Sequence, residues 1–294
     1  MSKEIIRSPE MEKQIETKII LEFMRHGKKE DDKTKANEEL MLTPEGKAQA
    51  VAKGKELGPQ PEVSIAWGSP RKRSQETAVH VMLANEEIDP DASLEEMEKL
   101  IAKEIKIGKK IIEDERLNFN IEGPAGEEAE AAFKRGEYVP FLVKESDKLA
   151  IELDDKASST YTTQAGNVAE IIERYTKIGD NFNRIASKTD KYEKFGNQLE
   201  RYLGTHQGVV ECFVAKVLEK TEGIEKRDEF VKSVGGGFGE AEGIHIEIIN
   251  SGSDQKIKID FGINGNKESI GIDKEILESI IKEREEFEKK VNKV

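Results

Sequence analysis

The chain has 294 residues, of which 36% are hydrophobic and another 36% are charged, and its formal net charge is −13. This composition is sufficient for one sizeable α/β core with a smaller inserted or appended piece. The acidic balance disfavours a broad surface for nucleic acid or anionic lipid, so any anionic substrate must meet a local basic pocket. The only cysteine is Cys212, which excludes an intramolecular disulfide and a multi-cysteine metal centre and indicates a reducing compartment.

The N-terminal segment, residues 1–18, is charged throughout and lacks the apolar region of a signal peptide. No stretch of the sequence approaches the roughly 20 apolar residues that a membrane-spanning helix needs. We therefore expect a cytoplasmic protein with neither a membrane nor a nucleic-acid partner. The sequence leaves the oligomeric state open.

The first half of the chain predicts strands that alternate with helices. Apolar runs predict strands at residues 18–24, 63–67 and 109–113. Apolar spacing and capping signals predict helices at residues 43–57, 69–85 and 94–103. Thr43 and Ser69 are the expected N-caps of the first two helices, and Pro44 lies at the first helical position. Glu22, inside an apolar strand, has no partner that the sequence identifies.

The second half of the chain begins with a stretch of weak periodicity. From Gly123 to about Thr163, Glu, Ala, Lys and Gly accumulate, which favours an insertion over a core element. The elements expected after it are a helix at 166–187, a strand at 198–203, a helix at 209–218, a hairpin of 244–249 with 256–261, and a final amphipathic helix at 273–292. Strands that alternate with helices predict a largely parallel sheet with its ligand site beyond the carboxyl ends of the strands.

Four polar clusters lie near these expected strand ends. They are Arg25-His26, Arg71 with Arg73, Glu115, and His206. A nucleophilic imidazole, guanidiniums, a carboxylic acid and a second imidazole are the groups that phosphoryl transfer through histidine requires. Arginine binds phosphoryl oxygens in pairs and neutralises their charge, while an acid protonates the departing alkoxide.

The clusters belong to longer motifs that occur in a characteristic order. Phe23-Met24-Arg25-His26-Gly27 contains an RHG signature, and Leu42-Thr43 with Gly46 and Gln49-Ala50 matches LTxxGxxQA. Ser69-Pro70 with Arg73 and Thr77-Ala78 matches SPxxRxxxTA. Glu115-Arg116 with Glu122-Gly123 follows, and then Thr205-His206-Gln207-Gly208-Val209-Val210, which is similar to SHGGVI. In this order and context the motifs resemble those of the histidine phosphatase superfamily, the phosphoglycerate-mutase-like branch with the RHG motif.

The resemblance implies a role for each motif residue. His26 would be the nucleophile, and Arg25, Arg73 and His206 would contact the phosphoryl group. Glu115 would be the proton donor. Residues beside the motifs are further candidates for phosphate or substrate binding, namely Thr205, Gln207 and Lys28.

The resemblance also implies the architecture. We expect a three-layer αβα sandwich with a mixed, mostly parallel central sheet, as in the phosphoglycerate mutases, over residues 18–272. Residues 123–198 would form an inserted α-rich cap, which in this family often covers the substrate. Residues 273–294 would form a C-terminal amphipathic helix packed on the core.

The predicted function is hydrolysis of a small phosphate monoester through a phosphohistidine on His26, with no metal and no cofactor. A phosphomutase is one alternative, although Lys28-Lys29 stands where the mutases usually carry Glu, and no Trp-Asn pair follows before Thr43. A non-catalytic phospho-ligand-binding protein is the other, because Gln207 replaces a common Gly.

Two further segments have more than one interpretation. We expect Arg71 and Lys72 to be solvated residues of the first helical turn, with binding of an outer phosphate oxygen as the alternative. The glycine-rich segment 235–239 lacks the Lys-Ser/Thr ending of a P-loop and the spacing of a dinucleotide fingerprint, and therefore predicts a flexible loop.

Overall fold

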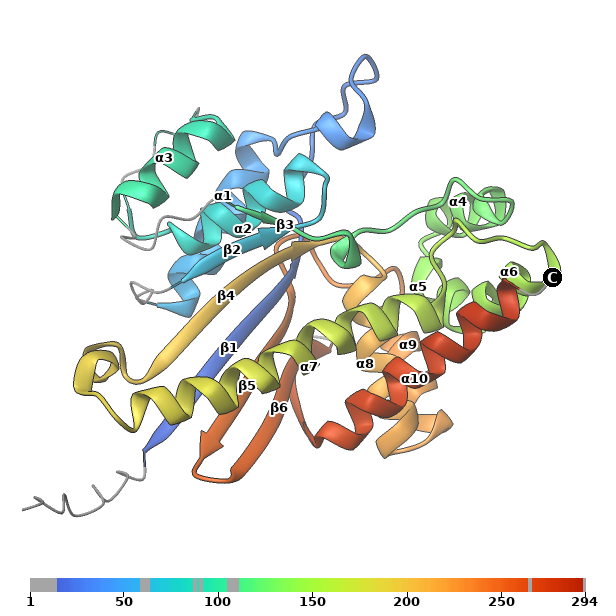
Figure 1. Cartoon of the computed structure of the whole chain (residues 1–294). Helices are drawn as coiled ribbons and strands as arrows, with labels where there is room; N and C mark the ends of the chain where they lie inside the picture. The colour runs from blue at the N-terminus through green and yellow to red at the C-terminus, as the bar shows by residue number, and fades with distance from the viewer. Residues whose placement is uncertain are drawn as a thin grey trace, which may run out of the picture.

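The computed structural model describes residues 15–58, 64–86, 89, 92–104, 111–263 and 266–292. A seven-stranded sheet lies at its centre, with the strand order β3-β2-β4-β1-β5-β6-β7 (Figure 1). The strands are β1 Glu16–Arg25, β2 Ile65–Gly68, β3 Ile112–Glu113, β4 Gln198–Thr205, β5 Gly243–Ser251, β6 Asp254–Ile263 and β7 Asn266–Ile272.

Helices cover both faces of this sheet. The α-helices are α1 Pro44–Leu57, α2 Lys72–Met82, α3 Leu94–Glu104, α4 Gly126–Lys134, α5 Tyr138–Phe141, α6 Asp147–Glu152, α7 Tyr161–Ala186, α8 Val209–Thr221, α9 Ile224–Val234 and α10 Lys274–Val291. Shorter elements are the 3₁₀ turns η1 Asn37–Glu39, η2 Glu115–Leu117 and η4 Asp190–Phe195, and the π-helical segment η3 Leu142–Ser146.

The sheet has a parallel half and an antiparallel half. Strands β3, β2, β4 and β1 run parallel, whereas β5, β6 and β7 pair antiparallel. In the parallel half, Arg25 pairs with Thr205, and Gly68 pairs with both Gly204 and Glu113. The carboxyl ends of all four parallel strands therefore meet at one edge of the sheet.

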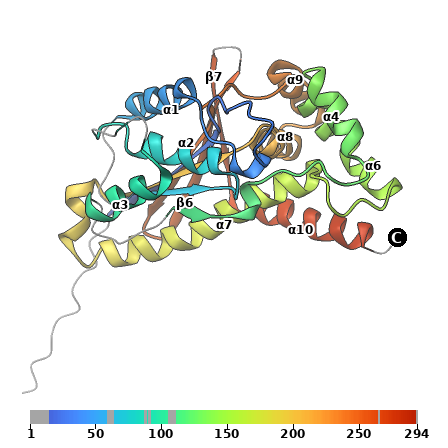
Figure 2. The ribbon, with the colours of Figure 1, turned by 90° about the horizontal axis from the view of Figure 1, so that it is seen from above.

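The layers are best followed in the view from above. Figure 2 shows α1 and α2 on one side of the sheet and α7 with α10 on the other. On β1, Ile19, Leu21 and Phe23 face the core cluster that includes α7 and α8, while Met24 joins the cluster beneath α1 and α2. This alternation follows from the two-residue period of a strand buried on both faces. The expected αβα sandwich with a mixed sheet is confirmed.

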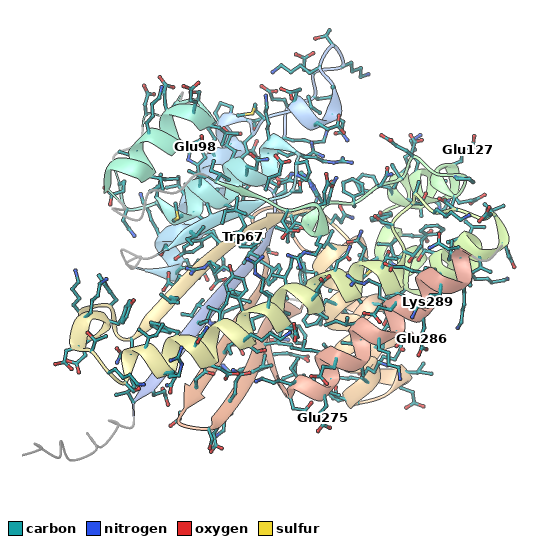
Figure 3. The ribbon with its side chains drawn as sticks, viewed as in Figure 1. Trp67, Glu98, Glu127, Glu275, Glu286 and Lys289 are labelled. Carbon is teal, nitrogen blue, oxygen red and sulfur yellow. The ribbon has the colours of Figure 1, made fainter. Side chains whose placement is uncertain are left out.

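The C-terminal helix packs as its apolar stripe predicts. On α10, Leu277 and Ile280 are buried against the main core, and Phe287 and Val291 pack with Ala150 of α6. Figure 3 shows the labelled charged side chains of α10, among them Glu286 and Lys289, which are exposed to solvent. The buried Trp67 on β2 packs instead against Tyr175 of α7, with ring centroids 6.0 Å apart.

Several element boundaries differ from the expected ones. Helix α2 begins at Lys72, and Ser69 is not its N-cap, because residues 69–71 are not helical and the Ser69 hydroxyl bonds to other groups. The sequence patterns also missed α9 and the edge strand β7, which is short and mostly exposed. The first residues of the strands expected at 63–67 and 109–113 lie outside the described residues.

The segment expected to form an inserted cap contains two kinds of structure. Residues 126–152 fold into α4, α5, η3 and α6 beside the sheet. The 26-residue α7 lies in the same segment, yet it packs on β1 and β5 and belongs to the layer that covers the sheet. The division into domain and cap stays a proposal, which concerns residues 126–152 rather than α7.

A close backbone contact holds the loop after His26 against α1. A Cβ atom on Gly27 would lie 2.6 Å from the carbonyl oxygen of Gly46, and one on Gly46 would lie 2.2 Å from that of Lys28. Both distances are too short for a side chain, so glycine is required at both positions. The contact explains in physical terms why each of the first two motifs contains a glycine.

We predict that Gly46→Ala destabilises the protein although alanine favours helices by about 1 kcal/mol relative to glycine. The added methyl group would push against the Lys28 carbonyl, and such overpacking typically costs about 1–3 kcal/mol. Chemical denaturation measures the effect, with Ala52→Gly on the exposed face of α1 as the control for helix propensity. A stabilised Gly46→Ala variant would contradict the contact.

Candidate active site

His26 lies one residue beyond β1, at the edge where the parallel strands end. Its backbone N–H donates to the carbonyl of Thr205 over 2.9 Å, so the ladder with β4 continues by one residue. Its Nδ1 lies 2.8 Å from the carbonyl oxygen of Gly27. A carbonyl can only accept, so Nδ1 carries the proton and Nε2 keeps its lone pair. Nε2 accepts a 3.2 Å hydrogen bond from Nε of Arg73.

The surroundings keep His26 neutral. Burial, the guanidiniums of Arg73 and Arg25, and Lys29 lower the pKa of His26 to about 3, and they outweigh the Gly27 hydrogen bond, which raises it. A neutral imidazole with its Nε2 lone pair available is a nucleophile over the whole physiological pH range.

Two arginines of the expected set flank His26. Arg73 is only 2% exposed, and its Nη1 donates to the carbonyl of Asn37 in η1 over 2.6 Å. Burial and the nearby charge of Arg71 lower the pKa of Arg73 to about 10, so it remains a cation. Arg25 donates from Nη1 to the carbonyl of Phe238 over 2.7 Å, while its buried Nε has no hydrogen-bond partner among the described residues.

His206 lies opposite His26, with ring centroids 5.2 Å apart and the rings edge to face. Its Nε2 is 2.7 Å from Oγ of Ser69, and its buried Nδ1 has no hydrogen-bond partner in the part of the chain that the structure describes. Burial and the neighbouring groups His26 and Arg73 hold the pKa of His206 well below its usual value.

Ser69 fixes the ring of His206 through a small hydroxyl network. Its Oγ accepts from the backbone N–H of Arg71 and lies 2.8 Å from Oγ of Ser74. The Ser74 hydroxyl donates to the carbonyl of Arg71 over 2.8 Å, and one hydrogen bond joins Oγ of Ser69 to Nε2 of His206. Ser69 was expected to cap a helix, so this role is a correction, although the motif already contained the residue.

Arg71 is buried, which corrects the expectation that it is solvated. It is 5% exposed, and its guanidinium stacks 4.3 Å over the ring of Phe119. Its Nε donates to Oδ1 of Asn118 and its Nη2 to the carbonyl of Phe119. The neighbouring Lys72 instead pairs with Glu39 on the surface.

The buried guanidiniums at this edge have no carboxylate partner. Among the described residues, Arg25, Arg71 and Arg73 form no ion pair, and the groups that they bond are carbonyls, an amide and an imidazole. Arg71 and Arg73 are buried and Arg25 is half-buried, and cations removed from water without a counter-ion are costly unless an anion joins them. Buried polar atoms that lack a partner lie around the same centre: Nε of Arg25, Nη1 of Arg71, Oη of Tyr138 and Nδ1 of His206. The arrangement fits an anion with several acceptor oxygens.

Glu115 occupies the first position of η2, at the same edge of the sheet. Its carboxylate is exposed and accepts from Nδ2 of Asn118 over 3.3 Å. The hydroxyl of Thr205 donates to the carbonyl of Leu117, which ties η2 to the end of β4 beside His206. Glu115 also lies within electrostatic reach of Arg71, but it does not contact His26 directly.

Three other candidate residues have different partners from the expected ones. The hydroxyl of Thr205 donates to the carbonyl of Leu117 and thereby positions η2, while its role in phosphate binding stays a prediction. Lys28 pairs with Glu45 at the surface, and it is Lys29 whose charge reaches His26 and Arg73. The Gln207 amide donates to the carbonyl of Gly236.

Gln207 belongs to a set of contacts that order the glycine-rich segment. Glu211, fully buried in α8, accepts from the backbone N–H of Phe238 over 2.7 Å and from that of Gly208 over 2.9 Å. The carbonyl of Phe238 in turn accepts from Arg25. The segment 235–239 is therefore an anchored loop that orients Arg25.

Sequence reasoning missed some residues that shape the site. Phe119 lies 5.0 Å from the ring of His206 by centroids, and the buried Tyr138 packs edge to face on Phe119 at 6.3 Å. No local signal identifies these two residues, because only the fold brings them to His206. In the described ranges, no cluster of three or more His, Cys, Asp or Glu side chains is arranged to hold a metal ion, and no helix is long and apolar enough to cross a bilayer.

Solved structures of low sequence identity resemble the chain over most of its length. "Mycobacterial hydrolase 2" is 16% identical, with a TM-score of 0.46 and coverage of 90% of this chain and 96% of that one. A mycobacterial glucosyl-3-phosphoglycerate phosphatase is 16% identical, with a TM-score of 0.40 and coverage of 80% and 91%. A putative alpha-ribazole-5'-P phosphatase from Escherichia coli is 12% identical, with a TM-score of 0.43 and coverage of 87% and 99%.

The family comparison bears directly on the motifs. No curated protein matches the chain. The model of the histidine phosphatase superfamily, branch 1, matches residues 21–139, a range that runs from β1 through the RHG motif and Glu115 to Tyr138. The resemblance expected from the motifs is thereby confirmed over residues 21–139, where the chain matches the histidine phosphatase superfamily, branch 1.

Proposed function

We propose that the protein hydrolyses a small phosphate monoester through a phosphohistidine on His26. The observation that carries the proposal is the neutral imidazole of His26, whose Nε2 lone pair accepts from the buried guanidinium of Arg73, a cation with no carboxylate partner among the described residues. A nucleophile surrounded by unsatisfied donors is suited to an electrophile that carries several anionic oxygens.

In the first step, Nε2 of His26 attacks phosphorus and the bond from phosphorus to the alcohol oxygen breaks. The Nε–H of Arg73, which now donates to Nε2 of His26, would donate to a phosphoryl oxygen instead, and Arg25 and His206 would bind the other oxygens. The His26 ring becomes positively charged as its lone pair forms the P–N bond. The carbonyl of Gly27, which already accepts from Nδ1–H, stabilises that charge.

Glu115 is the proposed proton donor for the departing alkoxide. Its place in η2, which Thr205 ties to the end of β4, supports this role. In the second step, a water molecule attacks the phosphohistidine and gives its proton to the Glu115 carboxylate. The P–N bond breaks, phosphate leaves, and His26 regains its lone pair.

The proposed mechanism uses no metal ion. The guanidiniums of Arg25 and Arg73 supply the positive charge that Mg²⁺ supplies in many phosphoryl-transfer enzymes. They are preorganised by the Phe238 and Asn37 carbonyls, so little reorganisation is needed when the phosphoryl charge redistributes.

We predict that His26→Ala abolishes hydrolysis of an aryl phosphate and formation of an acid-labile phosphoenzyme, lowering kcat on the order of 10³-fold or more, because the nucleophile is lost. Steady-state kinetics and trapping with labelled substrate measure both effects, in excess EDTA. His245→Gln, in a histidine on β5, is the matched control. Turnover by His26→Ala at the wild-type rate would refute the mechanism. If the wild-type protein binds vanadate but hydrolyses no substrate, it is a non-catalytic binding protein.

We predict that the effect of Glu115→Gln depends on the leaving group. An alkoxide needs its proton in the transition state, whereas a nitrophenolate largely does not, so phosphoenzyme formation from an alkyl phosphate should slow by about 10²–10⁴-fold and that from an aryl phosphate much less. Single-turnover rates are the appropriate measurement, with Glu122→Gln as the control. Equal losses on both substrates would remove Glu115 from the donor role.

We predict that His26 makes the folded protein less stable as the pH falls from 6.5 toward 3. Its pKa is about 3 when folded, against an ordinary value of 6.5, so the unfolded chain binds more protons in this range. Between pH 7.5 and 5 the wild type should lose about 2 kcal/mol more stability than His26→Gln.

Chemical denaturation at the two pH values measures this difference. His245→Gln is a control of opposite sign: although burial opposes it, Glu22 and Glu247 raise the pKa of His245, so its contribution is present at low pH and lost as the pH rises. If wild type and His26→Gln lose equal stability, His26 is not held neutral by its surroundings.

A further inference from the structure

Arg71 has a donor that neither the fold nor the proposed mechanism uses. Its Nε donates to Oδ1 of Asn118 and its Nη2 to the carbonyl of Phe119, so both of these nitrogens have an acceptor. Its Nη1 is buried and has no hydrogen-bond partner among the described residues. Two of the three guanidinium nitrogens therefore have a structural role, and the third does not.

Tyr138 presents a second unused donor. The side chain is 1% exposed, and its Oη has no hydrogen-bond partner in the described part of the chain. Burial raises the pKa of Tyr138, so the hydroxyl keeps its proton and remains a donor, and Arg71 lies within its electrostatic reach. A buried tyrosine hydroxyl normally finds a partner, because leaving it unsatisfied costs about 1–3 kcal/mol.

Phe119 connects this pair to the phosphoryl site. Its ring lies under the Arg71 guanidinium, packs on Tyr138, and has its centroid 5.0 Å from that of His206. Arg71 also shares its electrostatic environment with Arg73 and His206. The two unused donors therefore border the place where a phosphoryl group would be held, Arg71 at the start of α2 and Tyr138 in α5.

Nearby acidic groups do not account for the charge of Arg71. Glu38, Glu115 and Glu122 act on it electrostatically, but none of them lies within ion-pair distance. Arg71 is a buried cation with one N–H donor unused, and the unused hydroxyl donor of Tyr138 packs on the same phenylalanine ring. Such a pair of donors favours an anionic acceptor.

We infer that Arg71 and Tyr138 form a second anion-binding subsite, which takes a carboxylate or a second phosphate on the alcohol portion of the substrate. The inference rests on the proposed function, because the phosphoryl group bound by Arg25, Arg73 and His206 fixes where the alcohol portion of the substrate lies. Both donor atoms are closed to solvent in the free protein, so the second anionic group reaches them when the segment around Phe119 or α5 moves.

The test compares three phosphate monoesters with the same three-carbon chain: 3-hydroxypropyl phosphate, 3-phosphonooxypropanoate and propane-1,3-diyl bisphosphate. We expect wild type to prefer the second or third over the first in kcat/KM, and the preferred one identifies the group as carboxylate or phosphate. Arg71→Met should lower kcat/KM for the preferred compound about 100-fold more than for 3-hydroxypropyl phosphate, whose own decrease measures the loss of the contacts to Asn118 and Phe119.

Tyr138→Phe is the more specific variant, because it removes a hydroxyl that has no hydrogen-bond partner among the described residues and keeps the packing of the ring. It should lower kcat/KM about 10-fold for the preferred compound alone, without lowering the melting temperature, whereas a purely structural tyrosine would show no such selectivity. Tyr192→Phe, in η4, is the matched control.

Calorimetric binding of the three compounds to His26→Ala tests the subsite without turnover. The subsite would be supported if a compound with two anionic groups binds selectively and Tyr138→Phe weakens that binding. If this holds but no compound is hydrolysed, the result would count against the proposed function and not against the subsite. Equal affinities of wild type for all three compounds, or equal losses on all three in the variants, would overturn the subsite.

Discussion

The parallel pairing of β1 with β4 is the constraint on which the rest of the site depends. Its register places Arg25 opposite Thr205, and the next bond, from the His26 N–H to the Thr205 carbonyl, sets the two histidines side by side. These residues lie about 180 positions apart in the sequence. Because side chains alternate along a strand, a slip of one residue would send His26 to the other face of the sheet.

The second constraint is the burial of positive charge without negative charge. A chain with a net charge of −13 has many carboxylates available, yet none pairs with Arg25, Arg71 or Arg73 among the described residues. Main-chain carbonyls hold all three in place, which orients the guanidiniums without neutralising them. The free protein thus bears an electrostatic cost that an anion would relieve, and these charges add to the effect of burial, which is the main cause of the low pKa of His26.

Residue patterns gave a good account of the layers and a partial account of the contacts. The strand and helix alternation predicted the sandwich, because periodicity reports which face of each element is buried. The motifs located Ser69, Gln207 and Thr205 but did not identify the groups to which they hydrogen-bond in the structure. A motif fixes the position of a residue along the chain and not the group that faces its side chain. Glu22 had no explanation in the sequence, and the structure supplies one in His245, its neighbour across β1 and β5.

The sequence by itself determined the order of the chemical groups, the candidate nucleophile within RHG, and the strand ends at which the groups lie. These features depend on local spacing and on residues that are adjacent in the chain. Only the tertiary structure decided that Arg71 is buried on Phe119 and that Tyr138 lies beside it, because they come from separate elements that meet only through packing. Whether a donor has an acceptor is likewise a property of the folded surroundings, which is why the unused donors appear only in three dimensions.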